Sequence, residues 1–208
     1  MKGGRFDRRG FLTALAVTVP AFARATSAVK AVVPAEEGMV LGNPKAKVTV
    51  IEYASLSCPH CAAWANDVFP AFKVKYIDTG RVRFVLREFL TAPAEMAAAG
   101  WLLARCAGPA KYFSVVDAIF KAQDKILAAG SMREGLLAVA AEAGIGEGSF
   151  DQCITDKKAL EDLSARVQLY ASRDKITGTP TFVVGERRLG GEQSLEALGA
   201  AIAAAVRR

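Results

Sequence analysis

The chain has 208 residues, of which 52% are apolar, and a formal net charge of +6. This length suits one domain with an insertion, and the apolar content can supply a core and argues against disorder. Half of the charge lies in residues 1–23, and no stripe of Lys and Arg interleaved with aromatic residues is present in the rest. Nucleic-acid binding is therefore not expected.

The first 28 residues are predicted to be an export signal. A basic segment over residues 2–9 precedes a mostly apolar run that ends in a small-x-small cleavage pattern at Ala23, and a second cleavage point follows Ala28. The apolar run is shorter than the roughly 20 residues that span a bilayer. Arg8-Arg9 with Phe11-Leu12 resembles the twin-arginine export motif, and an ordinary secretory signal is the alternative. Either route leads to the periplasm, where disulfides persist.

The next segment is predicted to alternate between strand and helix. Residues 24–46 are rich in Ala, Pro and Gly and form a linker with a short first element. Residues 47–54 are apolar on both faces, as in a central strand. The helix that starts at Pro59 is expected to be kinked or divided at Pro70, because a proline inside a helix removes a hydrogen bond. Residues 81–89 alternate again and form a second long strand.

A long helical block is predicted over residues 94–175. Ser131 and Glu134 form a capping box that opens one helix, which Gly144 can end, and a later helix has an apolar face made by Leu160, Leu163, Val167 and Tyr170. Residues 181–185 and 186–190 form a strand pair, and Ser194 caps a last helix. This order predicts an α/β domain, residues 29–92 and 176–208, with an inserted helical domain over residues 93–175.

Cys58-Pro59-His60-Cys61 lies at the junction between the first long strand and its helix. The two thiols are one helical turn apart, Pro59 stands where a helix favours proline, and His60 is the only histidine of the chain. In this context the pair is predicted to be redox-active. Half of a zinc site and a plain structural disulfide are the alternatives. A zinc site needs about four ligands, and the sequence offers no suitable set, so no metal is expected.

The position of Cys58 at a helix N-terminus favours its thiolate, because unpaired backbone N–H groups and the helix dipole stabilise an anion there. His60 is close enough to add positive charge or a hydrogen bond. A stabilised thiolate stabilises the reduced form and makes the Cys58–Cys61 disulfide a stronger oxidant. Cys61 is expected to be the buried partner. The dithiol is itself the redox group, so no other cofactor is expected.

A second motif, Gly178-Thr179-Pro180-Thr181-Phe182, accompanies the first. With both motifs and an insertion of roughly 80 residues, the chain resembles the thioredoxin superfamily and, more narrowly, the DsbA-like periplasmic thiol oxidoreductases, over about residues 38–206. The resemblance implies a thioredoxin fold with a helical insertion domain. It also implies that Pro180 is cis, that its loop faces the dithiol, and that Thr179 offers backbone groups to an extended peptide. An ordinary loop proline before a strand is the alternative.

The resemblance also implies a buried acid at Glu52, six residues before Cys58, that helps proton transfer at the inner sulfur. Burial would raise the pKa of this carboxyl group towards a useful range. Two other environments remain open for Glu52, namely a polar sheet edge and an ion pair with a lysine.

Cys106 and Cys153 both lie in the helical block and lack CxxC context. We expect a structural disulfide that joins two helices. A second redox pair and two buried free thiols are the alternatives.

The leading hypothesis for the function is an exported dithiol oxidase that passes its disulfide to reduced or unfolded exported proteins. The resemblance implies reoxidation by a membrane partner of the DsbB type. A disulfide isomerase or reductase of the same fold is the alternative, because Thr179 replaces the valine of the best-known DsbA proteins and is isomerase-like. Fewer than 20 residues separate the cleavage region from the first strand, which leaves no room for an N-terminal dimerisation domain, so a monomer is expected. A non-catalytic peptide-binding module is a third possibility.

Overall fold

The computed structural model describes residues 38–128 and 130–207, together with Met1 and Gly3. Apart from these two residues, the predicted export signal of residues 1–28 lies outside the described part. Within that part, no helix is both long enough and apolar enough to cross a bilayer.

A five-stranded sheet forms the centre of the fold, in the order β1-β3-β2-β4-β5. Its strands are β1 (Met39–Gly42), β2 (Val48–Ala54), β3 (Val82–Glu88), β4 (Thr181–Val184) and β5 (Arg187–Gly190). β2 pairs in parallel with β3, and the other pairs are antiparallel. All but one residue of β2 are buried, which agrees with the prediction of a central strand. Both long strands begin and end within one residue of their predicted bounds.

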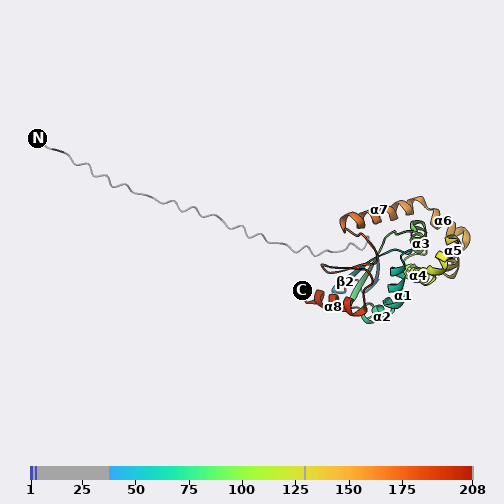
Figure 1. The fold of residues 1–208 in the computed structure, drawn as a ribbon, viewed down its shortest axis with the longest axis horizontal. Helices are drawn as coiled ribbons and strands as arrows, with labels where there is room; N and C mark the ends of the chain where they lie inside the picture. Colours follow the sequence, from blue (N-terminus) through green and yellow to red (C-terminus); the bar gives the residue numbers. More distant parts are fainter. Residues whose placement is uncertain (2, 4–37, 129, 208) are drawn as a thin grey trace. The chain divides into compact units, whose positions relative to one another are not determined.

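One face of the sheet is covered by α1 (Pro59–Asp67), α2 (Phe69–Phe72) and α8 (Leu195–Val206) (Figure 1). A five-residue π-helix, η2 (Lys73–Ile77), continues α2. The aromatic side chains of Trp64, Phe72, Phe84 and Phe182 meet in the core beneath these helices. The chain divides at Val68, and Pro70 lies in the first turn of α2, where its missing N–H costs no helical hydrogen bond. The expected division near Pro70 is therefore confirmed.

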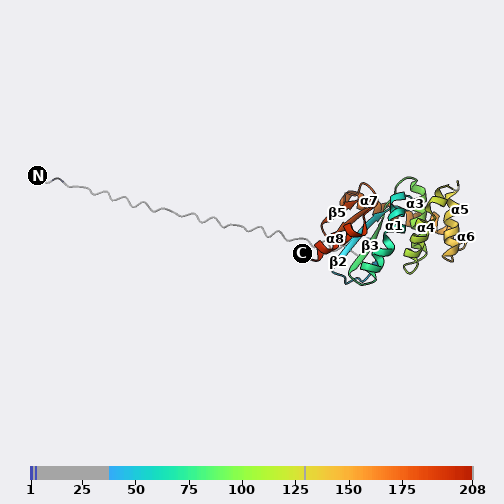
Figure 2. The same cartoon turned by 60° about the horizontal axis from the view of Figure 1, so that its bottom comes forward.

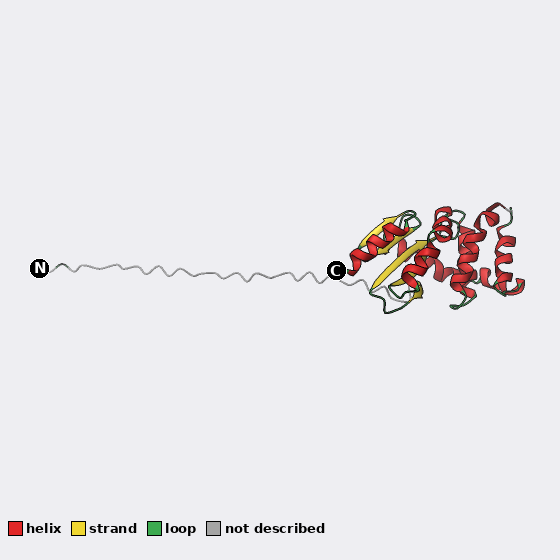
Figure 3. Ribbon diagram, turned by 90° about the horizontal axis from the view of Figure 1, so that it is seen from below, coloured by secondary structure: helices red, strands yellow, loops and turns green. Residues whose placement is uncertain are grey.

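The helical insertion contains α3 (Ala94–Cys106), α4 (Tyr112–Ala128), α5 (Met132–Glu142), α6 (Glu147–Thr155) and α7 (Lys157–Arg173). The first four of these helices form a group at the end of the molecule away from α8 (Figures 2 and 3). Ser131 accepts a hydrogen bond from the Glu134 N–H at 3.4 Å, and α5 ends two residues before Gly144, whose φ is +80°. The predicted start and end of this helix are both confirmed.

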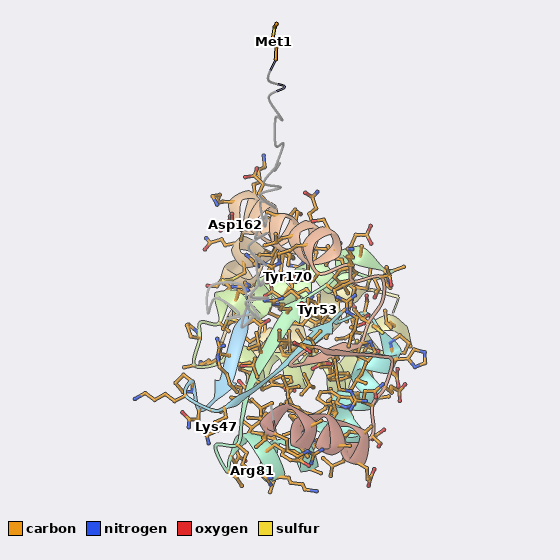
Figure 4. All side chains as sticks on the ribbon, turned by 90° about the vertical axis from the view of Figure 1, so that its left-hand side faces the viewer. Met1, Lys47, Tyr53, Arg81, Asp162 and Tyr170 are labelled. Atoms are coloured by element: carbon orange, nitrogen blue, oxygen red, sulfur yellow. A yellow bond between two sulfur atoms is a disulfide. The ribbon has the colours of Figure 1, made fainter. Side chains whose placement is uncertain are left out.

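α7 covers the second face of the sheet. Tyr170 packs edge-on against Tyr53 of β2 with ring centroids 5.7 Å apart (Figure 4), and the Arg87 guanidinium lies 4.9 Å from the centre of the Tyr170 ring. Leu163 is also buried, but Leu160 is 42% exposed, so the predicted apolar face was wrong at that residue. Because a helix turns about 100° per residue, Leu160 falls at the edge of the face that Leu163 and Tyr170 define.

Glu88, the last residue of β3, ties the insertion to the sheet. Its carboxylate is buried and accepts hydrogen bonds from Arg105 of α3, from the Tyr112 hydroxyl of α4 at 3.1 Å, and from Arg166 of α7 at 2.8 Å. A buried charge is tolerated only when it is paired and hydrogen-bonded. Glu88 therefore fixes three helices at the end of the strand next to β2.

Cys106 and Cys153 are joined by a disulfide, with their Cα atoms 5.8 Å apart. The bond connects the last residue of α3 to α6, within the insertion.

We predict that the variant Cys106→Ala/Cys153→Ala folds but melts at a lower temperature. The bond closes a loop with a sequence separation of 47, which in the chain-entropy model stabilises the fold by about 4 kcal/mol. The contacts of Glu88 and the buried helix faces remain in the variant, so the fold is retained. Thermal unfolding followed by circular dichroism measures the change. Comparison within a Cys58→Ser/Cys61→Ser parent isolates the effect of this one bond, and a variant that fails to fold would contradict the prediction.

Candidate active site

The dithiol lies where β2 passes into α1. Cys58 is the N-cap of α1 with an extended backbone, and Pro59 is the first helical residue. The N–H groups of Cys61 and Ala62 both donate to the Cys58 carbonyl at 3.1 Å, which closes the first helical turn. Both cysteines are free thiols with buried side chains. The local sequence thus places two sulfurs on one turn, at the positive end of the helix.

Cys58 is the sulfur that carries negative charge. A hydrogen bond from the Cys61 thiol is the largest cause that lowers its pKa, to about 5, and the Thr179 side chain and the backbone N–H groups of Cys61 and His60 lower it further. Burial acts in the opposite direction but is outweighed. A thiol with this pKa is almost fully ionised at neutral pH.

Cys61 has the opposite character. Burial is the main cause that raises its pKa far above the ordinary value, and the charges of Glu52 and Cys58 raise it further. Its side chain is fully inaccessible. The pair therefore consists of an outer thiolate and an inner protonated thiol, and the hydrogen bond between the two stabilises that arrangement.

Glu52 lies on β2 and is 3% exposed. Burial raises its pKa to about 8, and the negative charge of Cys58 contributes in the same direction. Its Oε1 atom has no hydrogen-bond partner among the described residues, and the side chain borders a pocket lined by Trp64, Phe84 and Phe120. The open alternative of a polar sheet edge is wrong because β2 is the central strand. No ion pair with a lysine is present in the described part of the chain.

The loop before β4 faces the dithiol. The Thr179–Pro180 peptide bond is cis, and the Thr179 carbonyl lies 3.4 Å from the Cys58 sulfur, in position to accept from its thiol. The Thr179 hydroxyl is buried, and a hydrogen bond from this side chain is one of the causes that lower the pKa of Cys58. The carbonyl thus interacts with the thiol form of Cys58, and the hydroxyl favours the thiolate form.

His60 contacts a residue that sequence reasoning missed. Its ring is exposed, and Nδ1 lies 2.5 Å from Oε1 of Glu192, on the loop between β5 and α8. Glu192 is the main cause that raises the pKa of His60, and the charge of Cys58 adds to the effect. The backbone N–H of His60 helps to lower the pKa of Cys58, and its ring is bonded to Glu192 and interacts electrostatically with Cys58. The partners are 132 residues apart, so no local pattern could reveal the pair.

Two further contacts hold the segment that leads into Cys58. The buried side chain of Gln123, on α4, donates to the Leu56 carbonyl at 2.8 Å and to the Cys58 carbonyl at 3.1 Å. The Ser57 hydroxyl donates to the Thr91 carbonyl at 2.8 Å. The one sequence signal for Gln123 was an amide placed on the apolar face of an amphipathic helix. No cluster of three or more His, Cys, Asp and Glu side chains suited to a metal ion occurs among the residues described.

Comparison with known proteins agrees with the fold. Residues 34–204 match the family model described as thioredoxin. The solved structure of alpha-DsbA1 from Wolbachia pipientis has a TM-score of 0.73 and 29% identity, and the match covers 82% of this chain and 93% of that one. The chain belongs to the thioredoxin-like DsbA family. The predicted fold class, a thioredoxin fold with a helical insertion, is confirmed.

One sequence relative of this DsbA-family protein and one further solved structure define the extent of the likeness. A protein of Rickettsia typhi, named as a protein-disulfide oxidoreductase, is 41% identical over 147 residues, which cover 70% of this chain and 54% of the relative. The chain thus spans about half the length of this curated relative. The structure of oxidised BdbD from Bacillus subtilis has a TM-score of 0.70 at 21% identity. The match covers 84% of this chain and 95% of BdbD, and it shows that the two share the fold.

We predict that Glu52→Gln removes a pH-dependent loss of stability from this DsbA-family protein. The raised pKa of Glu52, about 8 against 4.5, means that the folded state keeps a proton that the unfolded state releases above pH 4.5. Stability is therefore fully present below that pH and is lost as the pH rises towards 8. Between pH 4 and pH 7 the wild type should lose about 3 kcal/mol that the variant keeps.

Urea unfolding of the reduced proteins at both pH values measures this difference. Glu95→Gln removes an exposed carboxylate of α3 and serves as the matched control. Equal pH dependence in the wild type and in Glu52→Gln would show that Glu52 is ionised in the folded protein at neutral pH.

We also predict that Gln123→Leu lowers the free energy of unfolding by about 1–3 kcal/mol, because the buried Leu56 carbonyl loses its donor. Gln152→Leu, at an exposed position of α6, should change it by no more than about 0.5 kcal/mol. Denaturant unfolding compares the two, and equal effects would show that the Gln123 contacts do not stabilise the loop.

Proposed function

We propose that this protein is a periplasmic dithiol oxidase that introduces disulfides into exported proteins through Cys58 and Cys61. The observation that carries the proposal is the opposite ionisation of the two sulfurs, with a stabilised thiolate at Cys58 and a protonated thiol at Cys61. Because the thiolate stabilises the reduced form, the disulfide form is the stronger oxidant.

The proposed reaction starts from the Cys58–Cys61 disulfide. A substrate thiolate attacks the Cys58 sulfur, so that a mixed disulfide forms and the bond to Cys61 breaks. Cys61 leaves with the electron pair and takes up a proton. A second substrate thiolate then attacks the substrate sulfur of the mixed disulfide, and Cys58 leaves as its thiolate. The substrate loses two electrons and gains a disulfide, while the Cys58–Cys61 disulfide gains those electrons and is reduced to the dithiol.

The surroundings support each half of this reaction. A low pKa makes Cys58 a good leaving group in the second step. The high pKa of Cys61 requires a proton donor in the first step, and Glu52, with a pKa of about 8, is the nearby acid that can supply it. Thr179 and Pro180 border Cys58 and would hold an extended segment of the substrate through backbone hydrogen bonds.

Substrates, partner and location follow from this proposal. The substrates would be reduced or unfolded exported proteins, since both substrate cysteines must reach the Cys58 sulfur. Turnover requires an oxidant for the reduced dithiol, and a membrane protein of the DsbB type would supply it to a monomeric enzyme. Export would depend on the signal predicted in residues 1–28, by the twin-arginine or the general secretory route.

A disulfide isomerase or reductase is the second candidate, because Thr179 stands where the best-known DsbA proteins have valine. Its carbonyl contacts the thiol form of reduced Cys58, whereas its side chain lowers the pKa of Cys58, which by itself favours the oxidase.

Equilibration of Cys58–Cys61 with glutathione tests the proposal. An oxidase should have a potential well above the roughly −270 mV of thioredoxin and should accelerate oxidation of a reduced, unfolded protein. Cys58→Ser and Cys61→Ser should each abolish this activity, whereas Cys106→Ala/Cys153→Ala should retain it. A potential as low as that of thioredoxin, or rescue of a scrambled protein without oxidase activity, would contradict the oxidase function.

A further inference from the structure

We propose that Glu192 is a positioning residue of the dithiol centre, whose carboxylate fixes the ring of His60 in the first turn of α1. The inference deepens the proposed function, on which it rests, because it names a residue outside both motifs that tunes the outer sulfur. The proposal rests on the contact of 2.5 Å between His60 Nδ1 and Glu192 Oε1.

The loop that carries Glu192 is anchored on both sides of that residue. The Gly191 N–H donates to the Pro180 carbonyl at 2.8 Å. The Trp64 indole N–H donates to the Gln193 carbonyl at 3.1 Å. The backbone of Glu192 is therefore held between α1 and the loop that contains the cis-proline.

This anchoring distinguishes the pair from an ordinary surface ion pair. Exposed pairs contribute little because two long, mobile side chains must be ordered. Here His60 is fixed by the first turn of α1, and Glu192 is fixed by its two neighbours. Both side chains are exposed to solvent, so the anchored backbones fix where the two side chains begin, while the side-chain torsions of Glu192 are still ordered by the contact itself.

The contact determines the state of the ring. A carboxylate accepts a hydrogen bond from Nδ1–H, so it selects the tautomer or the cation in which Nδ1 carries the proton. Of the charged groups next to His60, Glu192 on the loop and Cys58 at the start of the helix both favour the imidazolium. Coupling between two titrating groups is reciprocal. A cation at His60 therefore favours the Cys58 thiolate to the same extent that the thiolate favours the cation.

The test uses the fact that His60 is the only histidine of the chain. Its ring resonances in NMR spectra of the full chain report one site without assignment. In the wild type the ring should titrate above 6.5, and in Glu192→Gln the ring pKa should fall. Glu196→Gln, which removes a carboxylate from the first turn of α8, is the matched control and should leave the ring pKa unchanged.

The equilibrium with glutathione gives the second readout. With less imidazolium beside it, the Cys58 thiolate loses stabilisation, so Glu192→Gln should make the disulfide about two- to fivefold less oxidising in its equilibrium constant. A double-mutant cycle tests the route. In a His60→Ala background, Glu192→Gln should have no further effect, because its action passes through the ring.

An unchanged ring pKa in Glu192→Gln would overturn the inference, and so would an equal shift of the glutathione equilibrium with and without His60. Failure of the proposed function looks different. If the wild type does not oxidise a reduced protein, the oxidase proposal fails, while the titration of His60 still decides the role of Glu192.

Discussion

The hydrogen bond between the two active-site sulfurs depends on their different surroundings, since one lies at a helix N-terminus and the other lies in the core. Cys58 stands at the N-cap of α1 and receives backbone N–H groups, whereas Cys61, one turn later, lies in the core. One sulfur is thus stabilised as an anion and the other as a neutral thiol. The difference between the two pKa values requires both environments. If Cys61 were exposed, or if Cys58 did not stand at a helix end, the two sulfurs would titrate more alike.

The helical insertion helps to hold the active-site segment in position. Gln123 reaches from α4 to the segment before Cys58, and Ser57 is bonded to the connection between β3 and α3 at Thr91. The Trp101 indole of α3 donates to the Phe89 carbonyl in the same connection. The dithiol segment is therefore held from the insertion on one side, while the loop with Pro180 faces it from the other.

Local rules were sufficient for those parts of the fold and site that depend on neighbours in sequence. The two long strands, the break near Pro70 and the cap at Ser131 follow from periodicity, proline geometry and capping chemistry, and all three are present. Leu160 shows the limit of such rules, since a periodic pattern identifies a helix but does not determine how it rotates against its neighbours.

The contacts that complete the site were beyond local rules for a different reason. Glu192, Gln123 and Glu88 find their partners through the fold, at sequence separations of 132, 67 and 78 residues in the contacts with His60, Leu56 and Arg166. In the sequence, nothing distinguishes these residues from the other Glu and Gln residues of the chain. Only the topology, with β4 beside β2 and the insertion beside the strand ends, brings the partners together.

The buried carboxylate of Glu88 has a consequence for how the protein comes apart. Its partners belong to three helices of the insertion, and if Arg105 and Arg166 leave together, the carboxylate stays in the interior as an unpaired charge. Detachment of the insertion alone is therefore disfavoured, and the sheet and the insertion should behave as one cooperative unit. The segment that leads into Cys58, which Gln123 of the insertion holds, would therefore not be released by a local opening of the insertion.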